Sequence, residues 1–170
     1  MSAVPDVSLI MANYNGARYL APAIQSAIAQ TYRSWELILV DDTSTDDGVA
    51  AARQAANGDP RIRIIRQERN RGPAAARNRA IELASGAWIA IFDSDDIMLP
   101  HRLETLLRRA ETDRADIIAD NQLLFSDDTK PRRFLTNRLG RAASWVDLAT
   151  FIDSSRRYAR NPDLGYLKPM

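Results

Sequence analysis

The chain has 170 residues, the length of one domain of about 100–200 residues, and its hydrophobic (45%) and charged (26%) fractions are typical of an ordinary globular protein. Twenty-three basic residues against twenty-two acidic ones leave a net charge of +1, which argues against electrostatic steering towards nucleic acid. The lack of cysteine excludes disulfides, thiolate metal sites and cysteine nucleophiles, and a single histidine, His101, excludes a polyhistidine metal site.

Short apolar runs alternate with helical patterns along the first two-thirds of the chain. We predict strands at residues 7–12, 36–40, 61–65, 87–92 and 116–120. Apolar spacing and the positions of proline and glycine predict helices at residues 19–30 and 73–85, one from residue 100 onward, and an alanine-rich helix that ends near residue 56. This alternation predicts an α/β fold, with a mostly parallel, doubly wound sheet and helices on both faces.

The sequence changes character beyond Asn121. Residues 126–143 carry charges, a proline and a glycine without a clear period, which predicts a loop or crossover, and Ser144 is a candidate cap for a short helix. Residues 154–170 are polar, rich in arginine and interrupted by Pro162 and Pro169. We therefore expect an α/β domain at residues 1–120 and an incomplete second region at residues 121–170 whose sequence ends as if cut.

Polar residues follow three of the predicted strands. Asn13 and Tyr14 follow the first strand, the pair 41–42 follows the second, and the acidic stretch 93–96 follows the fourth. In open parallel sheets, ligands bind outside the carboxyl ends of the strands. Each cluster alone could instead serve a turn or a helix cap. Three clusters that converge at one edge predict a shared ligand site.

The aspartates narrow the class of ligand. Two ionised carboxylates about 4 Å apart repel by about 4 kcal/mol at an effective dielectric constant of about 20, so clustered aspartates favour a bound cation. In a chain without cysteine and with one histidine, this cation takes oxygen ligands, which favours Mg²⁺ or Mn²⁺. The pattern Asp93-x-Asp95 at the end of a buried strand suits such an ion, because Mg²⁺ commonly binds through one or two carboxylates plus substrate phosphates.

Residues 70–78 form the second element of the expected site. Gly72 permits a tight entry and Pro73 suits a first helical turn, which leaves a helix N-terminus able to face an anion. Arg77 lies one turn further along, within reach of a phosphate or a ribose oxygen. The alternative is that Arg77 only pairs with a surface carboxylate.

Taken in order, these features resemble the family 2 glycosyltransferases of the GT-A fold. The matching segments are residues 7–15, 39–46, 70–78 and 92–96, and the resemblance covers residues 5 to about 112. It implies a set of donor-binding residues, which are Ala12, Asn13, Tyr14, Asp42, Arg77, Asp93 and Ser94. It also implies a metal site made by Asp95 and Asp93.

The resemblance further implies individual roles. Ala12 and Tyr14 would line the nucleotide pocket, and Asp42 would hydrogen-bond the base, typically uracil. Arg77 would help to hold the nucleotide. The donor's ribose or sugar would contact Asp93, and the metal on the diphosphate would be held by Asp95.

The implied reaction moves a sugar from a nucleotide diphosphate, typically UDP, to a polysaccharide or lipid-linked acceptor, with inversion and with a divalent metal that stabilises the leaving group. The implied partners are this donor and a saccharide acceptor, without nucleic acid. The tail at residues 165–169 looks like that of succinoglycan-type exopolysaccharide glycosyltransferases.

The sequence also suggests where the chain resides. Its longest apolar run, residues 87–92, is far short of the roughly 20 residues that span a bilayer, and its start lacks the pattern of a signal peptide. We expect a cytoplasmic protein. Peripheral contact with the inner face of the membrane and self-association both stay open.

The chain departs from the family in its catalytic base. Inversion by direct displacement requires a carboxylate to take the proton of the acceptor hydroxyl. After Asp128, the acidic residues are Asp147, Asp153 and Asp163, and none lies in the family's context for the base. We therefore expect a donor-binding half without an identified base, and the alternative is a non-catalytic nucleotide-sugar-binding or assembly module.

Overall fold

The computed structural model describes residues 4–120, 122–126, 129–134 and 166–169. The chain divides into two compact units, residues 1–118 with 165–170 and residues 119–164. The strand that ends the chain therefore belongs to the first unit, whereas the sequence placed the whole of 121–170 in a second region. Among the residues that the structure describes, no helix is long and apolar enough to cross a bilayer.

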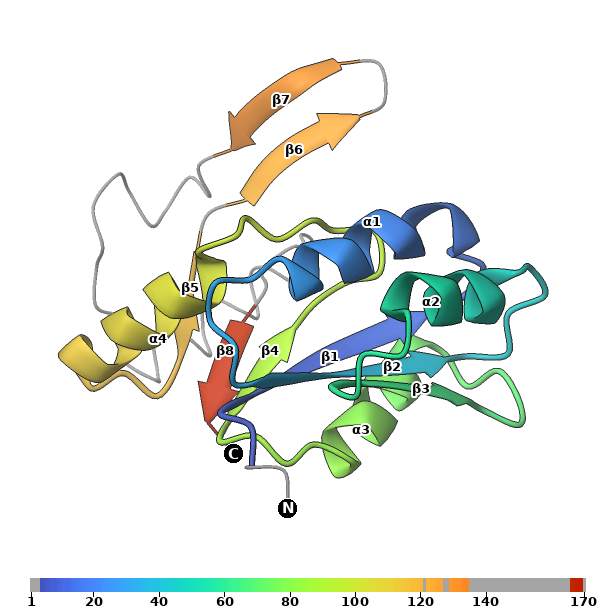
Figure 1. The fold of residues 1–170 in the computed structure, drawn as a ribbon, viewed down its shortest axis with the longest axis horizontal. Coiled ribbons are helices and arrows are strands. Elements are labelled where there is room, and N and C mark those ends of the chain that lie inside the picture. The colour runs from blue at the N-terminus through green and yellow to red at the C-terminus, as the bar shows by residue number, and fades with distance from the viewer. Residues whose placement is uncertain (1–3, 121, 127–128, 135–165, 170) are drawn as a thin grey trace. The chain divides into compact units, whose positions relative to one another are not determined.

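The first unit is built on a six-stranded sheet with the strand order β3-β2-β1-β4-β8-β5 (Figure 1). Four strands run parallel, and they are β1 (Val7–Asn13), β2 (Trp35–Asp41), β3 (Ile62–Arg66) and β4 (Trp88–Ile91). The helices that connect or follow them are α1 (Ala17–Ile28), α2 (Gly48–Ala56), α3 (Pro73–Glu82) and α4 (Arg102–Asp113). A short strand, β5 (Ile118–Ala119), comes after α4. The α/β prediction is confirmed, and the element boundaries differ from the predicted ones by at most three residues.

Alternation along the strands produces two apolar layers. Leu9 and Leu37 belong to one buried cluster, which also contains buried residues of α1, α2 and α4. Ile10 and Ile38 belong to the other cluster, together with Ala76 and Ala80 of α3. Because successive side chains of a strand point to opposite faces, the two clusters lie on opposite faces of the sheet, as Figure 1 shows for α1 and α2 against α3. The prediction of helices on both faces is confirmed.

The last strand of the sheet was not predicted from the sequence. β8 (Tyr166–Pro169) pairs antiparallel with β4, so that Leu167 lies opposite Ala90. Its four residues are too few to show a period, and Pro169 normally argues against a strand. Here Pro169 is the last residue of the strand and lies opposite Trp88, the first residue of β4. The sheet is thus mostly parallel, as expected, with one antiparallel strand within it.

The second unit contains a hairpin where the sequence predicted a loop or crossover. β6 (Gln122–Ser126) pairs antiparallel with β7 (Thr129–Phe134) in a separate two-stranded sheet, so the loop prediction is wrong for residues 129–134. The pairing is irregular between Leu124 and Ser126, opposite the position of Pro131. A bulge of this kind accommodates a proline that cannot donate to the ladder. The short helix predicted after Ser144 lies outside the described residues.

Candidate functional site

A cleft of about 460 Å³ opens where β1, β2 and β4 end. This volume lies within the range of about 300–1,000 Å³ that is usual for small-molecule sites. Every residue that the resemblance implied for the site lines it, together with three residues of the predicted element 70–78. The lining is Ala12, Asn13, Tyr14, Asp42, Asn70, Gly72, Pro73, Arg77, Asp93, Ser94 and Asp95. The parallel sheet therefore brings the three polar clusters to one place, as their positions after the strands predicted.

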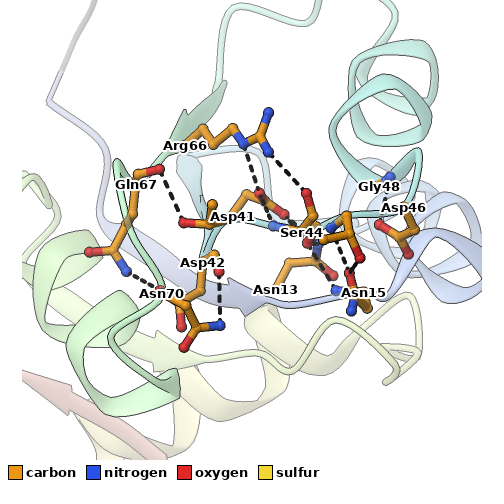
Figure 2. Close-up of polar contacts among 12 residues, drawn as sticks. Asn13, Asn15, Asp41, Asp42, Ser44, Asp46, Gly48, Arg66, Gln67 and Asn70 are labelled. Atoms are coloured by element: carbon orange, nitrogen blue, oxygen red, sulfur yellow. Dashed lines mark hydrogen bonds and ion pairs between the residues drawn. The ribbon is translucent and has the colours of Figure 1, made fainter.

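Asp41 links the end of β2 to the end of β1 (Figure 2). The register pairs Asn13 of β1 with Asp41 of β2, and the Asn13 side chain donates from Nδ2 to Asp41 Oδ1 at 2.9 Å. The backbone N–H of Ser44 donates to Asp41 Oδ2 at 3.0 Å, and Arg66 Nε lies 3.7 Å from the same oxygen. Asp41 is fully buried, so its carboxylate holds the turn that follows β2 instead of facing a ligand.

Asp42 turns the other way and holds the segment that precedes α3. Its Oδ1 accepts hydrogen bonds from Gln67 Nε2 at 2.7 Å and from the backbone N–H of Arg71 at 2.9 Å. Its Oδ2 accepts from the backbone N–H of Gly72 at 2.7 Å, and its carbonyl oxygen accepts from Asn70 Nδ2 at 3.1 Å. Asp42 is only 2% exposed but lines the cleft, so its carboxylate is fixed in position from behind.

Gly72 sets the path of the chain into α3. Its backbone has φ 84° and ψ 164°, a combination that is essentially restricted to glycine. This turn presents two consecutive N–H groups to Asp42 and then starts the helix at Pro73, whose fixed φ suits the first helical position. One turn into α3, Arg77 reaches the cleft. The predicted roles of Gly72 as a tight entry and of Pro73 as a helix start are therefore confirmed.

Arg77 pairs across the cleft with the first aspartate of the acidic stretch. Its Nη2 donates to Asp93 Oδ1 at 2.6 Å, and the two side chains are 36% and 44% exposed. Arg77 Nε is buried and has no hydrogen-bond partner among the described residues. The sequence predicts either a ligand or a surface carboxylate as the partner of Arg77, and the structure shows a pair with Asp93, a half-exposed carboxylate that lines the same cleft.

The two loops beside the cleft are held by side-chain to backbone contacts, which Figure 2 also shows in part. Asn15, which has a positive φ of 52°, accepts at Oδ1 from the backbone N–H of Thr45 at 2.8 Å. Asp46 accepts from the backbone N–H of Ala17 at 2.9 Å and from that of Gly48 at 3.0 Å. One carboxylate thus bonds the start of α1 and the start of α2.

The residues available for a metal ion are sparse. Asp93 and Asp95 line the cleft, and Asp95 is exposed. In the described part of the chain, no group of three histidine, cysteine, aspartate or glutamate side chains is gathered. Two carboxylates nevertheless fit Mg²⁺ or Mn²⁺ when phosphate oxygens and water complete the shell. His101 takes no part, because its side chain is 73% exposed and lies 3.6 Å from Glu104.

Sequence reasoning missed Gln67 and did not single out Asn70. Both are amides in the connection between β3 and α3, and both donate to Asp42. Nothing in their spacing distinguishes them from ordinary polar loop residues. Only the pairing of β2 with β3, which places Arg66 beside Asp41, brings this connection to the end of β2.

The chain matches glycosyl transferase family 2 over residues 8–165. It is 40% identical over 167 residues to the succinoglycan biosynthesis protein ExoO of Rhizobium meliloti (strain 1021), a match that covers 98% of this chain and 47% of that protein. The succinoglycan biosynthesis protein ExoU of the same organism is 38% identical over 173 residues, with 99% and 49% covered. This chain therefore spans about half the length of these curated relatives.

Solved structures with the same fold include glycosyltransferases with bound nucleotides. The crystal structure of S. aureus TarS 1-349 in complex with UDP superposes with a TM-score of 0.62 at 25% identity, over 65% of this chain and 33% of that chain. The mannosyltransferase PcManGT from Pyrobaculum calidifontis in complex with GDP-Man and Mn²⁺ gives a TM-score of 0.52 at 29% identity, over 56% and 29%. Since the family match covers most of the chain and the sheet agrees with these neighbours, this chain belongs to glycosyl transferase family 2 and has its GT-A fold.

Proposed function

We propose that this chain binds a UDP-linked sugar together with a divalent cation, as the donor-binding part of a glycosyltransferase. The observation that carries the proposal is the convergence of residues from three strand ends and from α3 on a single cleft. The bound UDP of the TarS structure and the bound GDP-Man and Mn²⁺ of PcManGT support the class of ligand.

Asp42 is the residue proposed to recognise the base. A carboxylate offers about four acceptor sites on two oxygens and no donor when ionised. Three protein donors already use the Asp42 carboxylate, which leaves one acceptor site for a ligand. An acceptor at this position favours a base with an N–H on its edge, such as uracil. Tyr14, which is 55% exposed beside Asp42 in the same lining, offers a flat apolar face to the nucleotide.

Arg77 and the acidic stretch after β4 are proposed to hold the diphosphate. Arg77 supplies a guanidinium that can bind phosphate oxygens, with its Nε still without a partner among the described residues. Asp95 and Asp93 would hold the cation, and when bound it neutralises the charge of the departing diphosphate. Asp93 and Ser94 are also placed to contact the ribose or the sugar of the donor.

The acceptor and the stereochemistry follow from the family resemblance. We propose transfer with inversion to a saccharide or lipid-linked saccharide, and the names of ExoO and ExoU favour exopolysaccharide synthesis. The catalytic base is not identified in the sequence, and the acidic residues after Asp128, which are Asp147, Asp153 and Asp163, lie outside the described residues. The alternative is a non-catalytic nucleotide-sugar-binding or assembly module, because no residue of the sequence is identified as the catalytic base.

The deciding experiment measures UDP binding by calorimetry with and without Mn²⁺, alongside hydrolysis or transfer from UDP-sugars. Binding that strengthens with Mn²⁺ supports the donor site, and binding without any turnover favours the module. Asp42→Ala should weaken UDP more than inorganic pyrophosphate. Equal losses for the two ligands would remove Asp42 from base recognition.

A further inference from the structure

We infer that Gln67 is a positioning residue for base selection, acting through Asp42. This inference rests on the proposed function, because it assumes that the free acceptor site of Asp42 meets the base of the donor. Gln67 itself is not among the residues that line the cleft, whereas Asp42 is. Gln67 therefore acts on the ligand through the carboxylate it bonds.

The backbone of Gln67 is tied to the end of β2 on both sides. Its N–H donates to the carbonyl oxygen of Asp41 at 2.8 Å, and its carbonyl oxygen accepts from Thr43 Oγ1 at 3.3 Å. The partners, Asp41 and Thr43, are the residues before and after Asp42, so these contacts hold the backbone of Gln67 next to Asp42. Its Nε2 donates to Asp42 Oδ1 at 2.7 Å (Figure 2).

The donors to the Asp42 carboxylate differ in kind. Arg71 and Gly72 donate from the backbone, and both N–H groups belong to the turn that precedes α3. Gln67 is the side chain that donates to this carboxylate among the described residues. Among the described residues, Gln67 and Arg71 both donate to Oδ1, whereas Oδ2 accepts from Gly72 alone, so the free acceptor site of the carboxylate lies on Oδ2. The Gln67 amide fills the second acceptor site of Oδ1 and so confines the base to Oδ2.

The consequence is selectivity between bases. Uracil presents an N–H where cytosine presents an acceptor nitrogen, so a fixed carboxylate attracts the first and repels the second. Without the Gln67 amide, Oδ1 of Asp42 regains a free acceptor site, so the base is no longer confined to Oδ2 and the difference in affinity between the two pyrimidines narrows. The proposed diphosphate contacts of Arg77, which does not bond Gln67 or Asp42 among the described residues, are unaffected.

The test measures dissociation constants of UDP, CDP and inorganic pyrophosphate, each with Mn²⁺, by calorimetry. The variants are Gln67→Met, which keeps the length of the side chain and removes the amide, and Gln67→Glu, which sets an acceptor against an acceptor. Glu68→Gln, a neighbouring change on an exposed side chain, is the matched control. We expect Gln67→Met to weaken UDP about tenfold, with pyrophosphate unchanged and the UDP preference over CDP reduced. Gln67→Glu should weaken UDP further, and Glu68→Gln should leave all three constants unchanged.

Two results would overturn the inference. UDP binding that is unchanged in both Gln67 variants removes the positioning role, and equal losses for UDP and pyrophosphate reveal a purely structural one. If Gln67→Met does not fold, the comparison of Gln67→Glu with the wild type decides alone. A wild-type chain that binds no UDP overturns the proposed function as well, so the two failures are distinguishable.

Discussion

Nη2 of Arg77 lies 2.6 Å from Oδ1 of Asp93, so that a residue of α3 and a residue beyond β4 meet within one cleft. Their side chains are 36% and 44% exposed, and a solvent-screened pair of this kind contributes about 0–1 kcal/mol to stability. The pair therefore does little for the fold. In the proposed donor site, Arg77 would exchange this partner for a phosphate and Asp93 would exchange it for a cation.

Arg77→Met should separate these two uses. We expect the affinity for UDP with Mn²⁺ to fall about tenfold, because one charge-assisted contact to the diphosphate is lost. The free energy of unfolding in urea should change by less than about 1 kcal/mol. Arg79→Met is the control, since Arg79 pairs with Glu82 at 2.9 Å on the same helix but does not line the cleft. Equal effects of the two changes on UDP binding would contradict the assignment of Arg77.

Asp95→Asn should reduce the dependence of UDP binding on Mn²⁺. The amide keeps an oxygen ligand but loses the negative charge, so we expect the gain in affinity on adding Mn²⁺ to shrink about tenfold. A titration of UDP at several Mn²⁺ concentrations measures this gain. Asp116→Asn, an exposed carboxylate that does not line the cleft, serves as the control. An undiminished response to Mn²⁺ in Asp95→Asn would exclude this residue as a ligand.

Gly72→Ala tests the backbone of the cleft. A Cβ at this position would meet no atom within 4 Å, so the cost comes from the conformation at φ 84° and ψ 164° alone. We expect a loss of about 1–3 kcal/mol in unfolding free energy, with faster hydrogen exchange at the amides that bond Asp42. Gly72→Ser should cost about the same. A cost that increases with the size of the side chain would point to a clash.

The sequence predicts which residues line the cleft, but it does not predict which hydrogen bonds each of them makes. Apolar runs identify parallel strands, and parallel strands bring Asn13, Asp42 and Asp93 to one edge without any knowledge of loops. Asp41 and Asp42, however, are adjacent and chemically identical. Asp41 is buried and bonds Asn13 because of the register between β1 and β2, whereas Asp42 lines the cleft and bonds the turn at Gly72.

Two of the strands that the sequence missed, β7 and β8, share a physical cause. β7 and β8 are short, contain proline and charged residues, and owe their order to pairing with a strand and not to an apolar period. Leu167 pairs with Ala90 across a long stretch of intervening chain. An apolar period reveals a strand only when the strand's own residues carry the pattern. A strand that is stabilised mainly by pairing with its neighbour shows no such pattern.

At the ends of β1 and β2 that lie away from the cleft, the Glu36 carboxylate accepts hydrogen bonds from two other segments of the chain. Its Oε1 accepts from Ser8 Oγ at 2.7 Å and from the backbone N–H and the Oγ of Ser85 at 2.8 and 2.7 Å. Burial alone would raise the pKa of this carboxyl, but the hydrogen bonds from Ser8 and Ser85, with Arg63 3.8 Å away, outweigh it and lower the pKa from its ordinary value of 4.5. A lowered pKa in the folded state means that ionised Glu36 stabilises the fold above pH 4.5, and that this contribution is lost as the pH falls through the folded-state value.

Glu36→Gln should therefore destabilise the chain at neutral pH and matter less in acid. We expect a loss of about 1–3 kcal/mol at pH 7 from the weakened buried network, and a smaller difference from the wild type as the pH falls below about 4. Urea unfolding at a series of pH values measures the difference directly. Glu104→Gln is the control, because hydrogen bonding to Thr31 also lowers the pKa of Glu104 but this carboxylate is on the surface. A difference between Glu36→Gln and the wild type that stays constant with pH would mean that packing, and not the charge of Glu36, holds β1, β2 and the start of β4 together.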